Sequence, residues 1–160
     1  MTAFSAPSEP IGHAARAWWD IHTETVDSPD DAEALVYDTL SRVFPHGGHG
    51  FTSWWGPLPT DQRDDSPLRV DLDVESGRAA VQWLPTKQTA VEPGVTAHHS
   101  PLLVTECTDY PPIQVPADRA LVTPGAAIRA IREYIETGQQ PTNLSWTGPA
   151  ATGVGPARSR

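Results

Sequence analysis

The chain has 160 residues, enough for one domain with a sizeable core but too few for two. Its 20 acidic and 11 basic residues give a formal net charge of −9, and the whole excess of acid lies in residues 1–80. Such a charge disfavours binding to nucleic acid or to a membrane surface and favours a basic partner. A solvated acidic surface without any partner is the alternative interpretation of the same composition.

The single cysteine, Cys107, excludes an intramolecular disulfide and fits a reducing compartment. The N-terminal residues lack the basic region and apolar run of a signal peptide, and no segment has the ~20 apolar residues that span a bilayer. We therefore expect a cytoplasmic protein. We also expect flexible tails over residues 1–16 and 148–160, flanking a single domain over residues 17–147.

The first predicted elements are a strand over residues 17–26, where apolar and polar residues roughly alternate, and a helix that begins at Ser28. Ser28 suits the N-cap, Pro29 suits the first helical position, and the acids that follow suit the positive end of the helix dipole. Five apolar residues form the predicted buried stripe of this helix: Ala32, Leu35, Val36, Leu40 and Val43. A further strand is predicted over residues 51–55.

Residues 68–84 carry the clearest hairpin signal in the chain. Leucine and valine alternate with charged residues in the first half, and a serine–glycine pair suits a tight turn before the chain returns. The outgoing strand should present Asp71, Asp73 and Glu75 on one face, about 7 Å apart at a rise of ~3.3 Å per residue. We expect this face to be open to solvent.

The second half of the domain begins with a predicted loop over residues 87–100, followed by an apolar strand over 101–107 that would suit the centre of the sheet. A proline-rich crossing leads to residues 121–146, which predict a short strand, a helix and a final strand from residue 143. Thr123 suits the N-cap of that helix, and Gly138 suits the left-handed residue that ends it. Three isoleucines form its apolar stripe: Ile128, Ile131 and Ile135.

These elements predict an α+β fold, with a mixed, mostly antiparallel sheet of about five to six strands packed with two main helices. Strand runs outnumber helices and are not paired one-to-one with them, which argues against a regular alternation of strand and helix. The alternative is an α/β sandwich with helices on both faces of the sheet.

Four histidines in two loops are the candidates for metal chemistry: His46, His49, His98 and His99. Their spacing matches no helical pair, and neither H-E-x-x-H nor C-x-x-C occurs, so exposed loop histidines are the favoured interpretation. Cys107 ends an apolar strand, where an inert thiol is usual. We predict no catalytic residue, no bound metal and no cofactor.

Tryptophan is unusually frequent, with six residues that include the pairs Trp18–Trp19 and Trp54–Trp55. Within a strand, one ring of each pair should face inward and the other outward. Exposed aromatic rings among acidic residues suit a protein-binding surface. Packing beneath loops, as part of a small core, is the alternative.

Two stretches, LRVDLDVESGRAAVQW over residues 68–83 and the strand–helix–strand unit over 121–146, resemble the first-numbered family of immunity proteins from bacterial polymorphic toxin systems. The helix that follows Asp27-Ser28-Pro29 fits as well, so the resemblance covers roughly residues 18–147. It implies a non-enzymatic α+β antidote that binds a cognate toxin domain, often a nucleic-acid deaminase. A monomer or weak dimer is expected, without direct binding to nucleic acid or membranes.

The acidic charge and this resemblance together indicate a basic toxin that acts on nucleic acid, whose cleft an acidic protein can occupy. Acidic residues would supply the contacts, and Trp54 or Trp55 would supply an aromatic anchor. The full set of predicted partner-binding residues is Asp30, Asp31, Trp54, Trp55, Asp64, Asp65, Asp71, Asp73 and Glu75. Two alternatives stay open: a metal-dependent enzyme that uses the loop histidines, and a generic protein-interaction adaptor.

Overall fold

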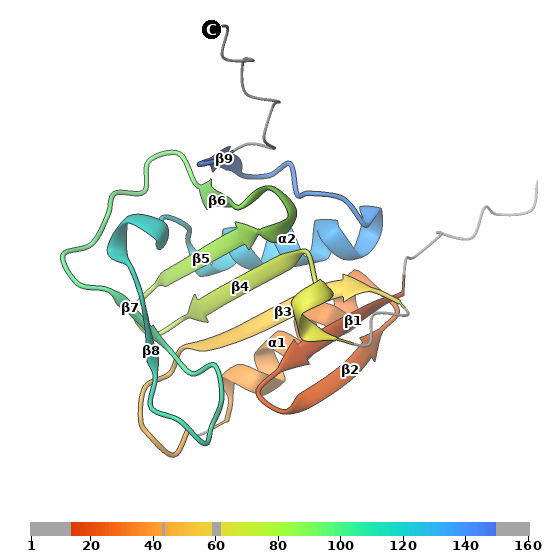
Figure 1. The fold of residues 1–160 in the computed structure, drawn as a ribbon, viewed down its shortest axis with the longest axis horizontal. Helices are drawn as coiled ribbons and strands as arrows, with labels where there is room; N and C mark the ends of the chain where they lie inside the picture. The colour runs from red at the N-terminus through yellow and green to blue at the C-terminus, as the bar shows by residue number, and fades with distance from the viewer. Residues whose placement is uncertain (1–13, 43, 59–61, 150–160) are drawn as a thin grey trace, which may run out of the picture.

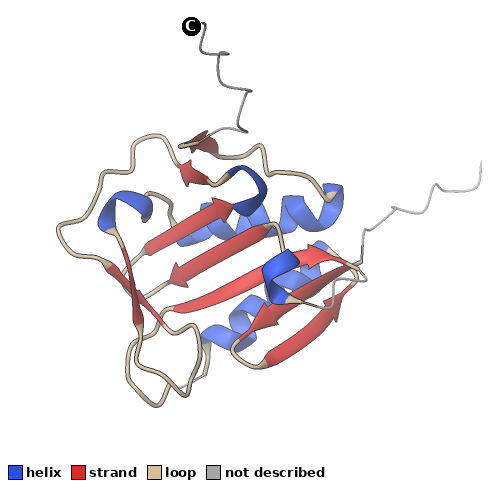
Figure 2. Ribbon diagram, in the orientation of Figure 1, coloured by secondary structure: helices blue, strands red, loops and turns tan. Residues whose placement is uncertain are grey.

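The computed structural model describes residues 14–42, 44–58 and 62–149 (Figure 1). A seven-stranded antiparallel sheet forms one layer, and two α-helices pack on one of its faces to form the other (Figures 1 and 2). The predicted α+β class is therefore confirmed, with more strands than expected. Because both helices share one face, the alternative with helices on both faces is wrong.

Strand order in the sheet is β2-β1-β3-β4-β5-β6-β9, and every neighbouring pair is antiparallel. The strands are β1 (Ala15–Trp19), β2 (His22–Val26), β3 (Phe51–Pro57), β4 (Leu68–Asp73), β5 (Arg78–Trp83), β6 (Gln88–Val91) and β9 (Ser145–Thr147). Strands β2 and β9 are thus the two edges of the sheet. The predicted tails fall mostly outside the described residues, although β1 already begins at Ala15.

The region predicted as one strand over residues 17–26 is a hairpin of β1 and β2, so that prediction is wrong. Asp20 adopts a left-handed backbone conformation with φ +51°, which lets the chain reverse within two residues. The Asp20 carboxylate accepts hydrogen bonds from the Thr108 amide at 2.8 Å and the Thr108 hydroxyl at 2.9 Å. These bonds tie the hairpin turn to a loop 88 residues further along the chain.

Both helices begin where local signals predict, and the second also ends there, whereas the first ends at Leu40, before the last residue of its predicted stripe. In α1 (Pro29–Leu40), the Ser28 hydroxyl caps the first turn by accepting a bond from the Asp31 amide at 3.1 Å. In α2 (Pro124–Thr137), Thr123 is the N-cap, and Gly138 ends the helix with φ +66°. The predicted apolar stripes face the sheet, apart from Val43, which lies outside the described residues.

The main core lies between the sheet and the two helices. Strand β4 contributes Leu68, Val70 and Leu72, all nearly inaccessible to solvent, and α2 contributes Ile131 and Ile135. Each such side chain gains about 1.5–3 kcal/mol from burial. The predicted hairpin of β4 and β5 is confirmed.

The opposite face of the sheet is partly covered by a small antiparallel sheet of β7 (Leu102–Val104) and β8 (Ile113–Val115). The run predicted as a central strand is therefore a cover for the main sheet rather than its centre. Gly50 permits this approach, because a Cβ there would collide with the Leu103 carbonyl oxygen. The described residues also contain three short 3-10 helices: η1 (Arg63–Asp65), η2 (Leu84–Thr86) and η3 (Ala117–Arg119).

Strand β6 lies within the predicted loop over residues 87–100 and joins β5 to the edge strand β9. The start of α2 is attached to this region through Glu92, whose carboxylate accepts bonds from the Thr123 amide and hydroxyl, each at 2.7 Å. Among the described residues, neither helix has the length and apolar character that crossing a membrane requires.

Candidate functional site

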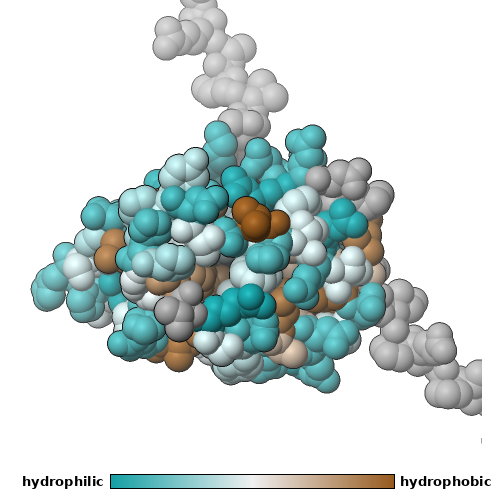
Figure 3. Space-filling view, turned by 90° about the horizontal axis from the view of Figure 1, so that it is seen from below, coloured by the Kyte–Doolittle hydropathy of each residue, from teal (hydrophilic) through white to brown (hydrophobic). Residues whose placement is uncertain are grey.

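Acidic residues are concentrated on the edge strand β2 and on the helix α1 that follows it. Between Arg16 and Arg42 the sequence has seven acids and no basic residue. All seven carboxylates are exposed or half-buried, and we call the six that follow the turn at Asp20 the acidic edge: Glu24, Asp27, Asp30, Asp31, Glu33 and Asp38. Figure 3 views the molecule from this side, below the view of Figure 1, and shows a largely hydrophilic surface with small separate hydrophobic spots.

Two arginines neutralise part of the acidic edge. Arg132 on α2 contacts Asp30 at 2.8 Å and Glu33 at 2.6 Å, and its hydrogen bond to Asp30 raises the pKa of the guanidinium. Arg42 contacts Asp38 at 2.9 Å. Three carboxylates of the acidic edge form no ion pair with the described residues: Glu24, Asp27 and Asp31. This uncompensated charge is available to attract a cation.

A groove of about 380 Å³ runs between β2 and α1 within the acidic edge. Glu24 borders it on the strand side, and Asp31 and Asp38 border it on the helix side. Its floor includes the apolar side chains of Ala34 and Leu35. The groove therefore combines an apolar base with a carboxylate rim.

The exposed position predicted for one tryptophan of the Trp54–Trp55 pair is wrong. The two rings do lie on opposite faces of β3, as alternation predicts, but Trp54 is 4 % exposed and Trp55 is 1 % exposed. Trp55 faces the helices, and its Nε1 donates to the Ser53 hydroxyl at 2.9 Å. The free protein thus offers neither ring to a partner.

Trp54 lies on the sheet face turned away from the helices, beneath two arginines. The guanidinium carbon of Arg63 lies 4.3 Å from its ring centroid, and that of Arg69 lies 5.4 Å away. Both guanidinium groups also contact the Glu106 carboxylate, at 3.7 Å and 4.0 Å respectively. The two arginines therefore cover the Trp54 ring through cation–π contacts and are held there by their ion pairs with Glu106.

Asp71 is 1 % exposed, so the prediction of a solvent-facing carboxylate is wrong. Its Oδ1 accepts hydrogen bonds from the Thr52 hydroxyl at 2.6 Å and from the Arg69 Nη2 at 3.1 Å. A buried charge is tolerated when it is paired and hydrogen-bonded in this way. Asp71 therefore acts within the fold.

The remaining predicted contacts are accessible but do not form one patch. Asp64 and Asp65 are exposed on η1, before β4, whereas Asp73 and Glu75 lie at the far end of that strand, about 17 Å away. Strand β4 ends at Asp73, so Glu75 lies in the turn, where it contacts His49 at 2.6 Å. Asp30 and Asp31 belong to the acidic edge on the helical side.

The loop histidines do not converge. His46, His49, His98 and His99 are all exposed, and the rings of the last two lie 6.0 Å apart. Within the described parts of the chain, no group of three or more histidine, cysteine, aspartate or glutamate side chains is placed to hold a metal ion. Geometry therefore adds nothing in favour of the metal-enzyme alternative.

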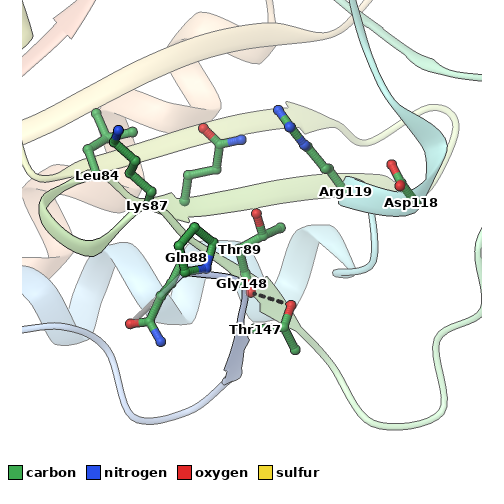
Figure 4. A pocket seen from close by; sticks show the side chains of 10 residues that line it. Leu84, Lys87, Gln88, Thr89, Asp118, Arg119, Thr147 and Gly148 are labelled. Carbon is green, nitrogen blue, oxygen red and sulfur yellow. Dashed lines mark hydrogen bonds between the residues drawn. The ribbon is translucent and has the colours of Figure 1, made fainter. Parts of the chain in front are cut away.

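A hollow of about 500 Å³ lies between η3 and the strands β5, β6 and β9 (Figure 4). Lys87, Thr89, Arg119 and Thr147 contribute to its lining, and the Thr147 hydroxyl donates to the Thr89 carbonyl oxygen at 3.4 Å. The described residues that line it include hydroxyl groups but no histidine or thiol. It therefore lacks the pairing of nucleophile and base that covalent catalysis uses most often.

The fold and surface define a two-layer α+β protein whose distinctive surface feature is a segregated acidic edge, as expected of a protein that binds charged partners. The chain belongs to the Imm1 family of immunity proteins, because the family model described as Immunity protein Imm1 matches residues 20–148. The resemblance inferred from the sequence is thereby confirmed. A search of curated proteins finds no match.

Family membership supports an immunity role, exercised by binding a cognate toxin rather than by catalysis. The sequence analysis did not select four residues of the acidic edge as partner contacts: Glu24, Asp27, Glu33 and Asp38. The signal that could have found them is the run of acids without a basic residue between Arg16 and Arg42.

Proposed function

We propose that this chain neutralises, by stoichiometric binding, a cognate toxin domain that acts on nucleic acid, such as a deaminase. The family match carries the immunity role. The acidic edge supports the narrower statement about the toxin, because an enzyme that binds nucleic acid presents basic residues to the phosphate backbone. An acidic protein can occupy such a cleft and compete with the natural substrate.

The acidic edge is the proposed first contact. It holds Asp30 and Asp31 from the predicted set, and α1 presents both at its N-terminal turn, where they are exposed. Asp31 forms no ion pair with the described residues, so a partner cation would not have to displace an existing one. Four further accessible carboxylates stay predicted contacts at separate places: Asp64, Asp65, Asp73 and Glu75.

Co-expression tests this proposal. The C-terminal domain of the protein encoded immediately upstream is induced in a bacterium with and without this chain, and survivors are counted. Rescue, together with a 1:1 complex on a sizing column, is the expected result. An active toxin that is neither bound nor counteracted would contradict the proposal. We propose that the protection takes place in the cytoplasm.

A further inference from the structure

The outer edge of β2 is an exposed strand edge of the described sheet. Strand β2 pairs with β1 on one side and with no described strand on the other. Four of its five residues, His22 to Thr25, are exposed, and only Val26 is buried. Five residues are enough for a second strand to pair along the edge.

Hairpin geometry shows which groups point outward. A two-residue turn joins Trp19 to His22, and the closing pair of such a turn exchanges main-chain hydrogen bonds. Because hydrogen-bonded and non-hydrogen-bonded pairs alternate, Glu24 also bonds to β1. The amide and carbonyl groups of Thr23 and Thr25 are therefore directed away from β1, along the free edge.

The other edge of the sheet offers less. Strand β9 has only three residues, and Pro149 follows it closely. Proline near an edge discourages pairing with another strand because it has no amide to donate. Strand β2 is therefore the longer of the two edge strands, and it is also the one that carries a residue of the acidic edge, Glu24.

The groove beside β2 indicates the chemistry of the occupant. The Glu24 side chain shares the helix-facing side of the sheet with Ala17, its partner in register on β1, and borders the groove opposite Asp31. A lysine or arginine entering there would lay its aliphatic stem over Leu35 and bring its charged group to these carboxylates. A neutral or acidic segment would gain no such contact.

We propose that β2 is a docking edge to which an extended, basic segment of the toxin adds as a further strand. Main-chain hydrogen bonds to Thr23 and Thr25 supply the pairing, and a basic side chain in the groove between β2 and α1 supplies the specificity. This inference rests on the proposed function and names the surface through which it operates.

The test uses the full chain and the purified toxin domain. Thr25→Pro removes one outward amide without removing a bond to β1, a position at which edge strands accept proline. Thr25→Ala is the matched control, since it removes the side chain and keeps the amide. We expect Thr25→Pro to weaken binding by about 30-fold or more and Thr25→Ala by less than about threefold.

Amide hydrogen exchange provides a second measurement that needs no variant. The Thr23 and Thr25 amides should exchange rapidly in the free chain and become protected in the complex. Protection already present in the free chain would show that another segment occupies the edge, and would overturn the proposal. Unchanged exchange on binding would overturn it as well.

Different results would overturn the docking edge on β2 and the proposed immunity role. If the wild-type chain rescues cells and binds the toxin while Thr25→Pro binds equally well in a folded state, the docking edge is wrong and the immunity role stands. If the wild-type chain does not bind, both are wrong. Circular dichroism of Thr25→Pro confirms folding, and hydrogen exchange decides the matter if that variant does not fold.

Discussion

Arg69 and Asp71 lie two residues apart on β4, and their side chains meet on the sheet face turned away from the helices, with Nη2 and Oδ1 3.1 Å apart. The Thr52 hydroxyl completes the site from β3 at 2.6 Å. Asp71 is buried and its charge is compensated by Arg69, which is half-buried and also contacts the Glu106 carboxylate at 4.0 Å. This relationship assigns Asp71 to the stability of the protein.

Replacing Asp71 tests that assignment. We expect Asp71→Asn to lower the free energy of unfolding by about 2 kcal/mol, because the Arg69 guanidinium loses the nearer and more deeply buried of its two carboxylate partners. Urea titration measures the loss. Asp118→Asn, an exposed acid, is the control and should change stability by less than about 0.5 kcal/mol. An Asp71→Asn protein of unchanged stability that no longer binds the toxin would contradict the account.

The turn of the β1–β2 hairpin should make stability depend on pH. Partial burial favours the neutral carboxyl of Asp20, but hydrogen bonds from Thr108, together with Cys107, outweigh it and hold the pKa of Asp20 below its ordinary value of 3.8. A lowered pKa in the folded state stabilises the protein above the unfolded pKa. That stabilisation is lost as the pH falls below about 3.8 and through the folded pKa.

Asp20→Asn isolates this charge, because asparagine also tolerates the left-handed backbone at φ +51°. We expect a loss of about 1 kcal/mol at pH 7, measured by urea unfolding, with a difference from wild type that narrows below pH ~3.8. A difference that stayed constant from pH 7 to pH 2.5 would mean that the carboxylate does not anchor the turn through its charge.

The two glycines at the ends of α2 should respond oppositely to alanine. Gly138 has φ +66°, so Gly138→Ala forces a side chain into the left-handed region and should cost about 1 kcal/mol, although nothing lies within 4 Å. Gly125 is exposed near the start of the helix, where a Cβ meets only Arg129 at 3.5 Å. Gly125→Ala should therefore stabilise by a few tenths to about 1 kcal/mol. Thermal unfolding of both variants measures the contrast, and equal shifts would refute it.

The parts of the fold that depend on neighbouring residues were predictable. Helix α2 begins at Thr123 and ends at Gly138 because a hydroxyl cap and a left-handed glycine act within one turn. The turn at Asp20 was not predictable, because no glycine marks the residue with positive φ. The residue that holds the turn, Thr108, is also distant in sequence. Strand β6 is only four residues long, and the sequence analysis assigned its residues to a loop.

The candidate site was harder to predict, because exposure depends on what covers each face. Alternation predicted that Asp71 and one ring of the Trp54–Trp55 pair face away from the core, but it could not show that Arg63 and Arg69 cover that side of the sheet. Charge counting did locate the acidic half of the chain. It could not show that the free carboxylates gather beside a strand edge, which is a property of the β1–β2 hairpin.

The acidic edge should control how fast the complex forms. The Glu24→Gln/Asp31→Asn variant loses two uncompensated charges, so we expect its association rate at low salt to fall by about threefold to tenfold. Glu136→Gln/Asp118→Asn removes the same charge from exposed sites elsewhere and is the matched control. Stopped-flow association at several salt concentrations compares them. A wild-type rate that does not depend on salt would contradict the electrostatic part of the proposal.

Titration of toxin activity against this chain tests the central claim most directly. Purified toxin domain at a fixed concentration, well above the dissociation constant, is mixed with increasing amounts of the full chain, and turnover of its nucleic-acid substrate is measured. The account predicts that activity falls linearly and reaches zero near one equivalent, as stoichiometric binding requires. Undiminished activity at several equivalents, or loss of activity at a small fraction of one equivalent, would contradict neutralisation by binding.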